Sequence, residues 1–220
     1  VPAGRDTTDR SMPPRPVGAV AGGHAFTFSY AEAAELLAAA GATVVTFDPL
    51  RDEALPADSR GLLIGGGFPE VFGEQLSANE PLRGHVAALA ASGAPVAAEC
   101  AGLLYLTREL DGRPMCGVLD ATATMTGRLT LGYRTAVAAA DSALARAGTA
   151  VAGHEFHRTA VEPASGHPPA WTVNARDEGF VTHHVHASYL HLHWAGYPAL
   201  ARRFVDTAIH RAELAAGVRP

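Results

Sequence analysis

The chain has 220 residues, of which 48% are hydrophobic and 18% are charged, and its formal net charge is −5. The sequence contains no run of basic residues. With this charge balance it offers no positively charged surface for nucleic acid or an anionic membrane, so we expect small-molecule or protein partners. The sequence shows neither an apolar run of about 18 residues nor an export signal, which makes a cytoplasmic location the simplest expectation.

Residues 1–15 begin with Val and are rich in Pro, Arg, Asp and Thr. We interpret them as a linker remnant that once joined a preceding segment, and we expect one domain over residues 16–220. The two cysteines, Cys100 and Cys116, are expected to be free thiols, because the chain has no secretory features.

Buried strand patterns and helical patterns alternate along the first half of the chain. We predict helices at 29–41 and 79–93, with Ser29 and Asn79 as N-caps, and a further helix directly after Cys100. The predicted strands lie at 16–21, 43–50, 61–67 and 95–99. This alternation predicts an α/β fold with a mostly parallel, flavodoxin-like sheet flanked by helices.

The second half of the chain changes character. Short strand-like segments separated by turn residues indicate added antiparallel strands, and a helix over 198–217 closes the chain. In parallel sheets, functional sites lie beyond the carboxyl ends of the strands. Two positions meet that description, namely the loop 65–70 and Cys100.

Cys100 stands where a predicted strand turns into a helix, in the segment PVAAECAGLLYL. A thiol is a good nucleophile only as the thiolate, and a helix N-terminus is expected to lower the pKa of a thiol placed there. The small residues Ala101 and Gly102 permit the sharp turn of a nucleophile elbow. The backbone N–H of Ala101 would then point toward a substrate oxygen.

The other parts of an acyl-transfer site are also present in the sequence. The loop GGGFPE is expected to bind the oxyanion through the backbone of Gly66, Gly67 and Phe68. The segment SYLHLHW places His191 and His193 near the end of an apolar strand, where one imidazole could act as the base.

Each of these features alone has a structural explanation: a packed cysteine, a glycine turn, a hydrogen-bonded histidine. Their combination favours a site, whereas Cys116 has no comparable setting. Five histidines lie between residues 183 and 193. His183 and His191 would stand about 26 Å apart along one extended strand, too far for one zinc site. His191 and His193 could bind a metal only with a third ligand such as His154 or His157, so we expect no metal site.

The motifs GGGFPE, AECAGLLYL, GHEFHRT and SYLHLHW occur in this order. Over about residues 15–215, the chain resembles the C-terminal class I glutamine amidotransferase domain of cobyrinic and hydrogenobyrinic acid a,c-diamide synthases, in the corrin pathway to vitamin B12. The resemblance implies glutamine hydrolysis with Cys100 as the nucleophile and a glutamyl thioester intermediate. It implies the class I amidotransferase fold as well.

The resemblance also implies an N-terminal synthetase domain that uses ATP and Mg to activate the a and c carboxylates of the corrinoid. This chain contains no P-loop motif, so we expect neither ATP nor any other cofactor in it. The expected partners are L-glutamine, the synthetase domain and its corrinoid substrate. Self-association into a homodimer is left open.

On the family pattern, Tyr189-Leu190-His191 selects His191 as the base, with His193 as the alternative. The chain has Ala101 where the family usually has Gly, and Trp194 where it has Phe. The usual acid two residues after the histidine is missing, so a Cys-His dyad or a third partner is implied, with Glu155 suggested for that role.

Two features stay open at this stage. Residues 153–157, GHEFH, either face the synthetase or the corrinoid rather than glutamine, or simply form a strand with a buried, hydrogen-bonded Glu155 and exposed histidines. Glu99, directly before the cysteine, has no assigned role. Two further hypotheses remain beside the glutaminase: a non-catalytic docking module of the same fold, and the glutaminase part of a nickel-sirohydrochlorin a,c-diamide synthase.

Overall fold

The structure is a computed structural model that describes residues 15–29, 31–215 and 217. The predicted linker, apart from Arg15, lies outside the described residues. The helices are α1 (Ala31–Ala39), α2 (Gly73–Ala78), α3 (Glu80–Ala91), α4 (Ala101–Leu106), the 3-10 helix η1 (Trp194–Gly196) and α5 (Pro198–Ala215). None of these helices is long and apolar enough to cross a membrane.

The strands form two sheets. Six of them, in the order β11-β12-β4-β3-β1-β2, make the first sheet. They are β1 (Val17–Ala21), β2 (Thr43–Phe47), β3 (Ser59–Ile64), β4 (Val96–Glu99), β11 (Phe180–Thr182) and β12 (Val185–Ser188). All neighbours in this sheet are parallel except β11 and β12. The mostly parallel α/β sheet predicted from the sequence is confirmed.

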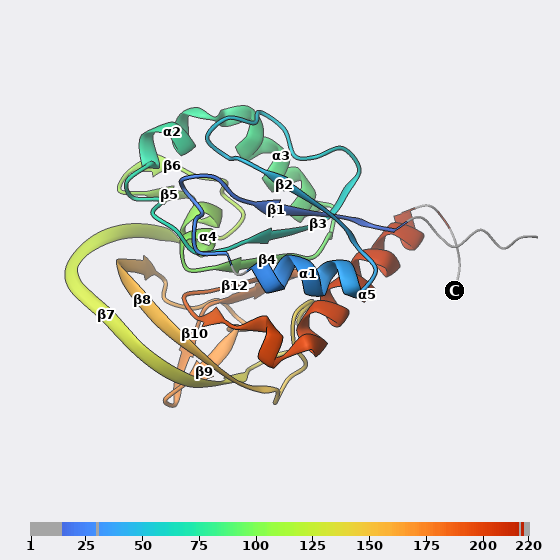
Figure 1. Cartoon of the computed structure of the whole chain (residues 1–220). Helices are drawn as coiled ribbons and strands as arrows, with labels where there is room; N and C mark the ends of the chain where they lie inside the picture. The colour runs from blue at the N-terminus through green and yellow to red at the C-terminus, as the bar shows by residue number, and fades with distance from the viewer. Residues whose placement is uncertain (1–14, 30, 216, 218–220) are drawn as a thin grey trace, which may run out of the picture.

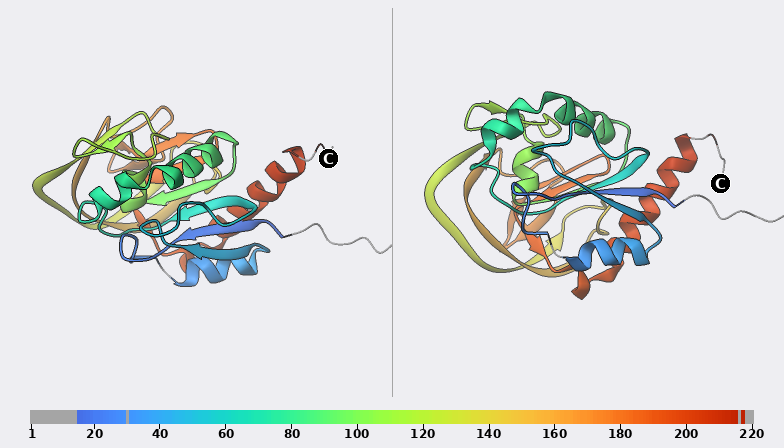
Figure 2. Two further views of the ribbon diagram at one scale, coloured as in Figure 1. Left: turned by 90° about the horizontal axis from the view of Figure 1, so that it is seen from above. Right: turned by 45° about the horizontal axis from the view of Figure 1, so that its top comes forward.

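Both faces of the first sheet are covered, so the residues in the middle of its central strands are mostly apolar. Along β3, Leu62 and Ile64 face one hydrophobic cluster and Leu63 faces the other. The first cluster contains the buried residues of α3 and α4, and the second contains those of α1 and α5. Figures 1 and 2 show these helices on opposite sides of the sheet.

The helix ends test the predicted caps. The side chain of Asn79 accepts a hydrogen bond from the N–H of Leu82 at 3.4 Å, which confirms it as the N-cap of α3. The cap position of α1, directly before Ala31, lies outside the described residues, so the prediction for Ser29 stays a prediction. Helix α2 was not predicted.

The second sheet is an addition to the parallel core. It is built on a long antiparallel pair, β7 (Thr122–Ala138) and β8 (Ala150–Glu162). Its shorter strands are β5 (Glu109–Leu110), β6 (Arg113–Pro114), β9 (Trp171–Val173), β10 (Arg176–Glu178) and β13 (His191–Leu192). In Figure 1 the pair β7–β8 bends around the end of the first sheet at which β1, β3 and β4 finish.

The segment that carries the candidate base differs from the prediction. Residues 188–194 do not form one continuous apolar strand. The chain leaves the first sheet after Ser188, and His191–Leu192 joins the second sheet by pairing with β8, where His191 lies opposite His154. The segment therefore connects the parallel core to the β7–β8 pair.

We predict that Gly102→Ala lowers the free energy of unfolding by about 1–3 kcal/mol, because a Cβ at this position would lie 2.4 Å from the backbone oxygen of Ile64. Gly84→Ala in α3 is the matched control. A Cβ there meets nothing within 4 Å, so alanine should stabilise the helix by about 0.5–1 kcal/mol. Denaturant titration of both variants measures the difference, and a Gly102→Ala protein as stable as wild type would contradict the prediction.

Candidate active site

Cys100 forms a sharp elbow between β4 and α4. Its backbone has φ 49° and ψ −100°, a conformation that strains a residue with a side chain and is concentrated at functional sites. Two backbone hydrogen bonds hold the elbow: the N–H of Cys100 donates to Ser188 at 2.8 Å, and the N–H of Gly102 donates to Gly65 at 3.1 Å. The predicted strand-to-helix turn at the thiol is present.

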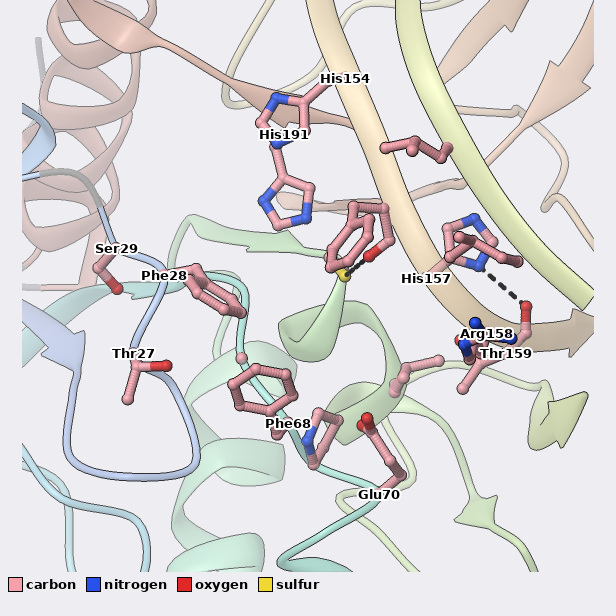
Figure 3. A pocket seen from close by; sticks show the side chains of 17 residues that line it. Thr27, Phe28, Ser29, Phe68, Glu70, His154, His157, Arg158, Thr159 and His191 are labelled. Atoms are coloured by element: carbon pink, nitrogen blue, oxygen red, sulfur yellow. Dashed lines mark hydrogen bonds between the residues drawn. The ribbon is translucent and has the colours of Figure 1, made fainter.

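The elbow opens into a cavity of about 630 Å³. Figure 3 shows the side chains that surround it. They come from the loop after β1, the loop after β3, the elbow, helix α4, both long strands of the second sheet, and β13. The lining residues are Thr27, Phe28, Ser29, Gly67, Phe68, Pro69, Glu70, Cys100, Leu104, Leu129, Leu131, His154, Phe156, His157, Arg158, Thr159 and His191. The cavity therefore contains both Cys100 and His191.

The His191 ring is held between two neighbours. It stacks on the ring of His154, with centroids 4.8 Å apart and planes 8° from parallel. On Gly66, a Cβ would lie only 2.3 Å from Cε1 of His191, so glycine is required there for the imidazole to approach the loop. Burial, followed by the neighbouring His154 and His157, lowers the pKa of His191 to about 4. The ring is neutral and able to accept a proton.

His193 lies elsewhere. It is exposed and lines a neighbouring hollow together with Tyr133 and Gly153. His191 borders this hollow too, but it also lines the cavity that holds Cys100. Of the two candidate bases, the structure thus brings His191 to the thiol's cavity.

The electrostatic environment of the thiol differs from the expectation. Burial, together with the negative charges of Glu70, Glu99 and Glu155, raises the pKa of Cys100 to about 12, against a lowering contribution from the N–H of Ala101. The predicted lowering by the helix end is wrong because removal from water outweighs it. The protonated thiol is 3.9 Å from the backbone oxygen of Phe156, to which it donates.

The glycine loop packs tightly on the segment after β1. A Cβ on Gly67 would lie 1.9 Å from the oxygen of Ala25, so the two backbones are in close contact. The N–H of Phe68 donates to that same oxygen at 3.0 Å. In this conformation the Phe68 N–H is already engaged, although the Phe68 ring lines the cavity. The oxyanion roles of Gly66, Gly67, Phe68 and Ala101 stay predictions.

The GHEFH segment belongs to β8 and contributes His154, Phe156 and His157 to the cavity. Glu155, suggested as a partner for the base, instead pairs with Arg134 at 2.6 Å and lies 3.9 Å from Nε2 of His157. His157 first and then Arg134 lower the pKa of Glu155 against the effect of burial. Glu155 therefore interacts with Arg134 of β7 and His157 of β8 rather than with His191.

The hydrogen bonds of two carboxylates near the elbow, the buried Glu99 and the half-buried Glu178, were not foreseen. Glu99 accepts from Nε1 of Trp194 at 3.0 Å and from the N–H of Leu192. Glu178 accepts from Oγ of Ser188 at 2.6 Å and from the N–H of Tyr189 at 2.7 Å. Burial raises the pKa of each carboxyl to about 7. No local sequence signal identifies these partners, because they lie far along the chain or on another sheet.

The second cysteine has a different setting. Cys116 is a free thiol, as is Cys100, which confirms the expectation for both. It is buried beside Tyr105, and burial raises its pKa. Within the described part of the chain, no group of three or more His, Cys, Asp or Glu side chains is arranged to hold a metal ion.

Comparison with known proteins identifies the family. Residues 19–199 match the CobB/CobQ-like glutamine amidotransferase domain. The chain belongs to this family. It is 71% identical over 191 residues to a hydrogenobyrinate a,c-diamide synthase of Streptomyces coelicolor, covering 86% of this chain and 39% of that protein. It is 44% identical over 198 residues to a cobyrinate a,c-diamide synthase of a Synechococcus strain, covering 86% and 43% respectively.

The chain thus spans about two fifths of the length of these curated relatives. Solved structures agree in fold. PurLQS from Thermotoga maritima superposes with a TM-score of 0.63 at 13% identity, over 90% of this chain and 99% of that one. A glutamine amidotransferase superposes with a TM-score of 0.61 at 21% identity, over 87% and 98%. The predicted amidotransferase fold is confirmed.

The raised pKa of Glu99 predicts a pH-dependent loss of stability. The folded protein retains this proton up to about pH 7, whereas an ordinary glutamate loses it near pH 4.5. Between these values the folded state binds more protons, so the Glu99 contribution to the unfolding free energy falls as pH rises, by up to about 1.4 kcal/mol per pH unit. Relative to Glu99→Gln, wild type should therefore lose stability from about pH 5 to about pH 7.

Denaturant titrations of both proteins across this range test the difference. The comparison with the variant is needed because His186 and His191, whose pKa values burial lowers to about 3 and about 4, change stability in the opposite direction. Glu74→Gln, at an exposed position of α2, is the control for removing one carboxylate. Parallel pH curves for wild type and Glu99→Gln would contradict the prediction.

Proposed function

We propose that this domain hydrolyses L-glutamine, with Cys100 as the nucleophile and His191 as the base. The observation that carries the proposal is the shared cavity: a thiol on a strained elbow and a neutral imidazole line it together. Membership of the glutamine amidotransferase family supports the same chemistry.

In the first step, sulfur of Cys100 attacks the side-chain amide carbon while His191 accepts the thiol proton. Because the thiol is protonated in the buried cavity, this transfer must accompany the attack. The carbon–nitrogen bond then breaks, and His191 returns the proton to the leaving ammonia. A glutamyl thioester remains on Cys100.

In the second step, a water attacks the thioester, His191 takes its proton and returns it to the sulfur, and glutamate leaves. Each step forms a tetrahedral oxyanion that requires N–H donors. We assign this role to the backbone of Ala101, Gly66 and Gly67. A contribution from Phe68 requires its N–H to leave the oxygen of Ala25.

The charged side chains of the cavity are suited to the other end of glutamine. Glu70 and Arg158 both line it and both appear in Figure 3. Glu70 is half-buried, and burial raises its pKa, so an incoming cation would stabilise its charged form. We propose that Glu70 binds the α-ammonium group and that Arg158 binds the α-carboxylate.

The ammonia acceptor is proposed from the longer relatives. We infer that the domain works with an N-terminal synthetase domain, which uses ATP and Mg to activate the a and c carboxylates of hydrogenobyrinic or cobyrinic acid, in the cytoplasm. Its relatives at 71% and 44% identity carry the names of these synthases. This favours a corrinoid over nickel-sirohydrochlorin, and the intact Cys100 and His191 favour an enzyme over a docking module.

Four side chains of the cavity lining are apolar and exposed, which is consistent with a second domain covering them. Phe28, Phe68, Leu131 and Phe156 all line the cavity, with 45%, 39%, 62% and 49% of their surfaces exposed. Exposed apolar side chains grouped around one cavity are typical of interaction sites. We propose that the synthetase domain covers these four side chains.

Cys100→Ala should lower glutamate release from glutamine by about 10³-fold or more, because the nucleophile is lost. Cys116→Ala is the control for loss of a buried thiol and should retain turnover. A glutamine-like electrophile should label Cys100 and leave Cys116 unmodified. Undiminished turnover by Cys100→Ala would refute the proposal.

Glu70→Gln should raise KM for glutamine by about tenfold, the equivalent of about 1.4 kcal/mol of lost binding, with kcat changed little. Steady-state glutamate release measures both constants. Glutaramate, which lacks the α-amino group, should be hydrolysed equally well by wild type and Glu70→Gln. If the variant loses as much activity toward glutaramate as toward glutamine, Glu70 does not bind the ammonium group.

A further inference from the structure

The candidate base stands on a weakly paired piece of chain. β12 ends at Ser188, and β13 consists of only His191 and Leu192, which pair with β8. Between β12 and β13, few backbone hydrogen bonds to neighbouring strands fix the path of the chain. The direction of the His191 ring must therefore depend on other contacts, and Glu155 is committed to Arg134 and His157.

On the N-terminal side of His191, the path is set by Glu178 of β10. Its two carboxylate oxygens accept from Oγ of Ser188 at 2.6 Å and from the N–H of Tyr189 at 2.7 Å. Oγ of Ser188 in turn accepts from the N–H of Leu190 at 2.9 Å. One carboxylate thus determines the course of the three residues before His191.

On the C-terminal side, the path is set by Glu99, the residue before Cys100. Its carboxylate accepts from the N–H of Leu192 and, at 3.0 Å, from Nε1 of Trp194. Trp194 is itself buried, with its ring 6.4 Å from that of Phe204 in α5. These bonds tie the residues after His191 directly to the elbow that carries the thiol.

We propose that Glu99 and Glu178 are positioning residues, which together orient His191 toward Cys100 by holding the chain on both sides of it. An acid hydrogen-bonded to the imidazole would orient His191 directly. Glu99 and Glu178 instead orient it indirectly, by fixing the backbone on both sides of it. The proposal rests on the proposed function, since it assigns these carboxylates to the base of that reaction.

Burial itself argues that the arrangement has a purpose beyond folding. Glu99 is 8% exposed, and Glu178 is half-buried. Burying a carboxylate destabilises its charged form, so these two side chains carry a desolvation cost that a neutral group of similar size would avoid. A role in folding alone therefore predicts that glutamine variants keep their activity, whereas a positioning role predicts that they lose it.

The test compares Glu99→Gln, Glu178→Gln and Trp194→Phe in the protein as it occurs, with any attached synthetase domain. Each variant should lower kcat by about 10- to 100-fold, because small misplacements of a catalytic group have effects of this size, with KM unchanged within about threefold. Glu99→Gln combined with Trp194→Phe should lose no more than the worse single variant, since Trp194→Phe removes the Nε1–H donor of the bond that Glu99→Gln weakens.

Ser142→Ala is the matched control for disturbing a buried polar contact. Ser142 is buried and hydrogen-bonded to His186 at 3.0 Å, outside the cavity lining. It should lower the melting temperature and leave kcat unchanged. If the two glutamine variants behave in the same way, with wild-type kcat and KM, the carboxylates are structural only and the proposal is wrong.

A second measurement separates this proposal from the proposed function. Alkylation of Cys100 by iodoacetamide requires loss of the thiol proton but no glutamine turnover. Its rate should fall in Glu99→Gln and Glu178→Gln toward the rate of His191→Ala. Rates equal to wild type would overturn the positioning role even in an active enzyme. A wild type that releases no more glutamate than Cys100→Ala would instead refute the glutaminase.

Discussion

The site depends on the way in which three strand ends are joined at Cys100. The N–H of Cys100 donates to Ser188 at the end of β12, and the N–H of Gly102 donates to Gly65 at the end of β3. These bonds hold the elbow in its strained conformation and place the glycine loop and the histidine-bearing segment beside it. Since each partner comes from a different strand, the site exists only when the parallel sheet is complete.

Burial of the elbow sets the electrostatics of the proposed reaction. Burial raises the pKa of Cys100 to about 12 and lowers that of His191 to about 4, so both groups are neutral at rest. A charged pair would be costly in such a cavity, and charge should therefore appear only when a substrate brings dipoles to stabilise it. The resting thiol is protected from general reactivity by the same effect.

Much of this arrangement could be predicted from local patterns. The alternating strands and helices, the Asn79 cap and the elbow at Cys100 follow from short stretches of sequence. The break after Ser188 did not, because SYLHLHW is as apolar as one continuous strand. The bond from Trp194 to Glu99 joins residues 95 apart, and the raised thiol pKa depends on tertiary burial. Such contacts leave no signal in neighbouring residues.

The close approach at Gly66 links two parts of the site mechanically. A Cβ there would lie 2.3 Å from the imidazole of His191, so only a hydrogen atom separates the loop from the ring. The Phe68 N–H, which donates to Ala25, lies only two residues along the same loop. A larger side chain at Gly66 would therefore displace either the loop or the imidazole, so the position of the loop amides and the position of the base depend on each other.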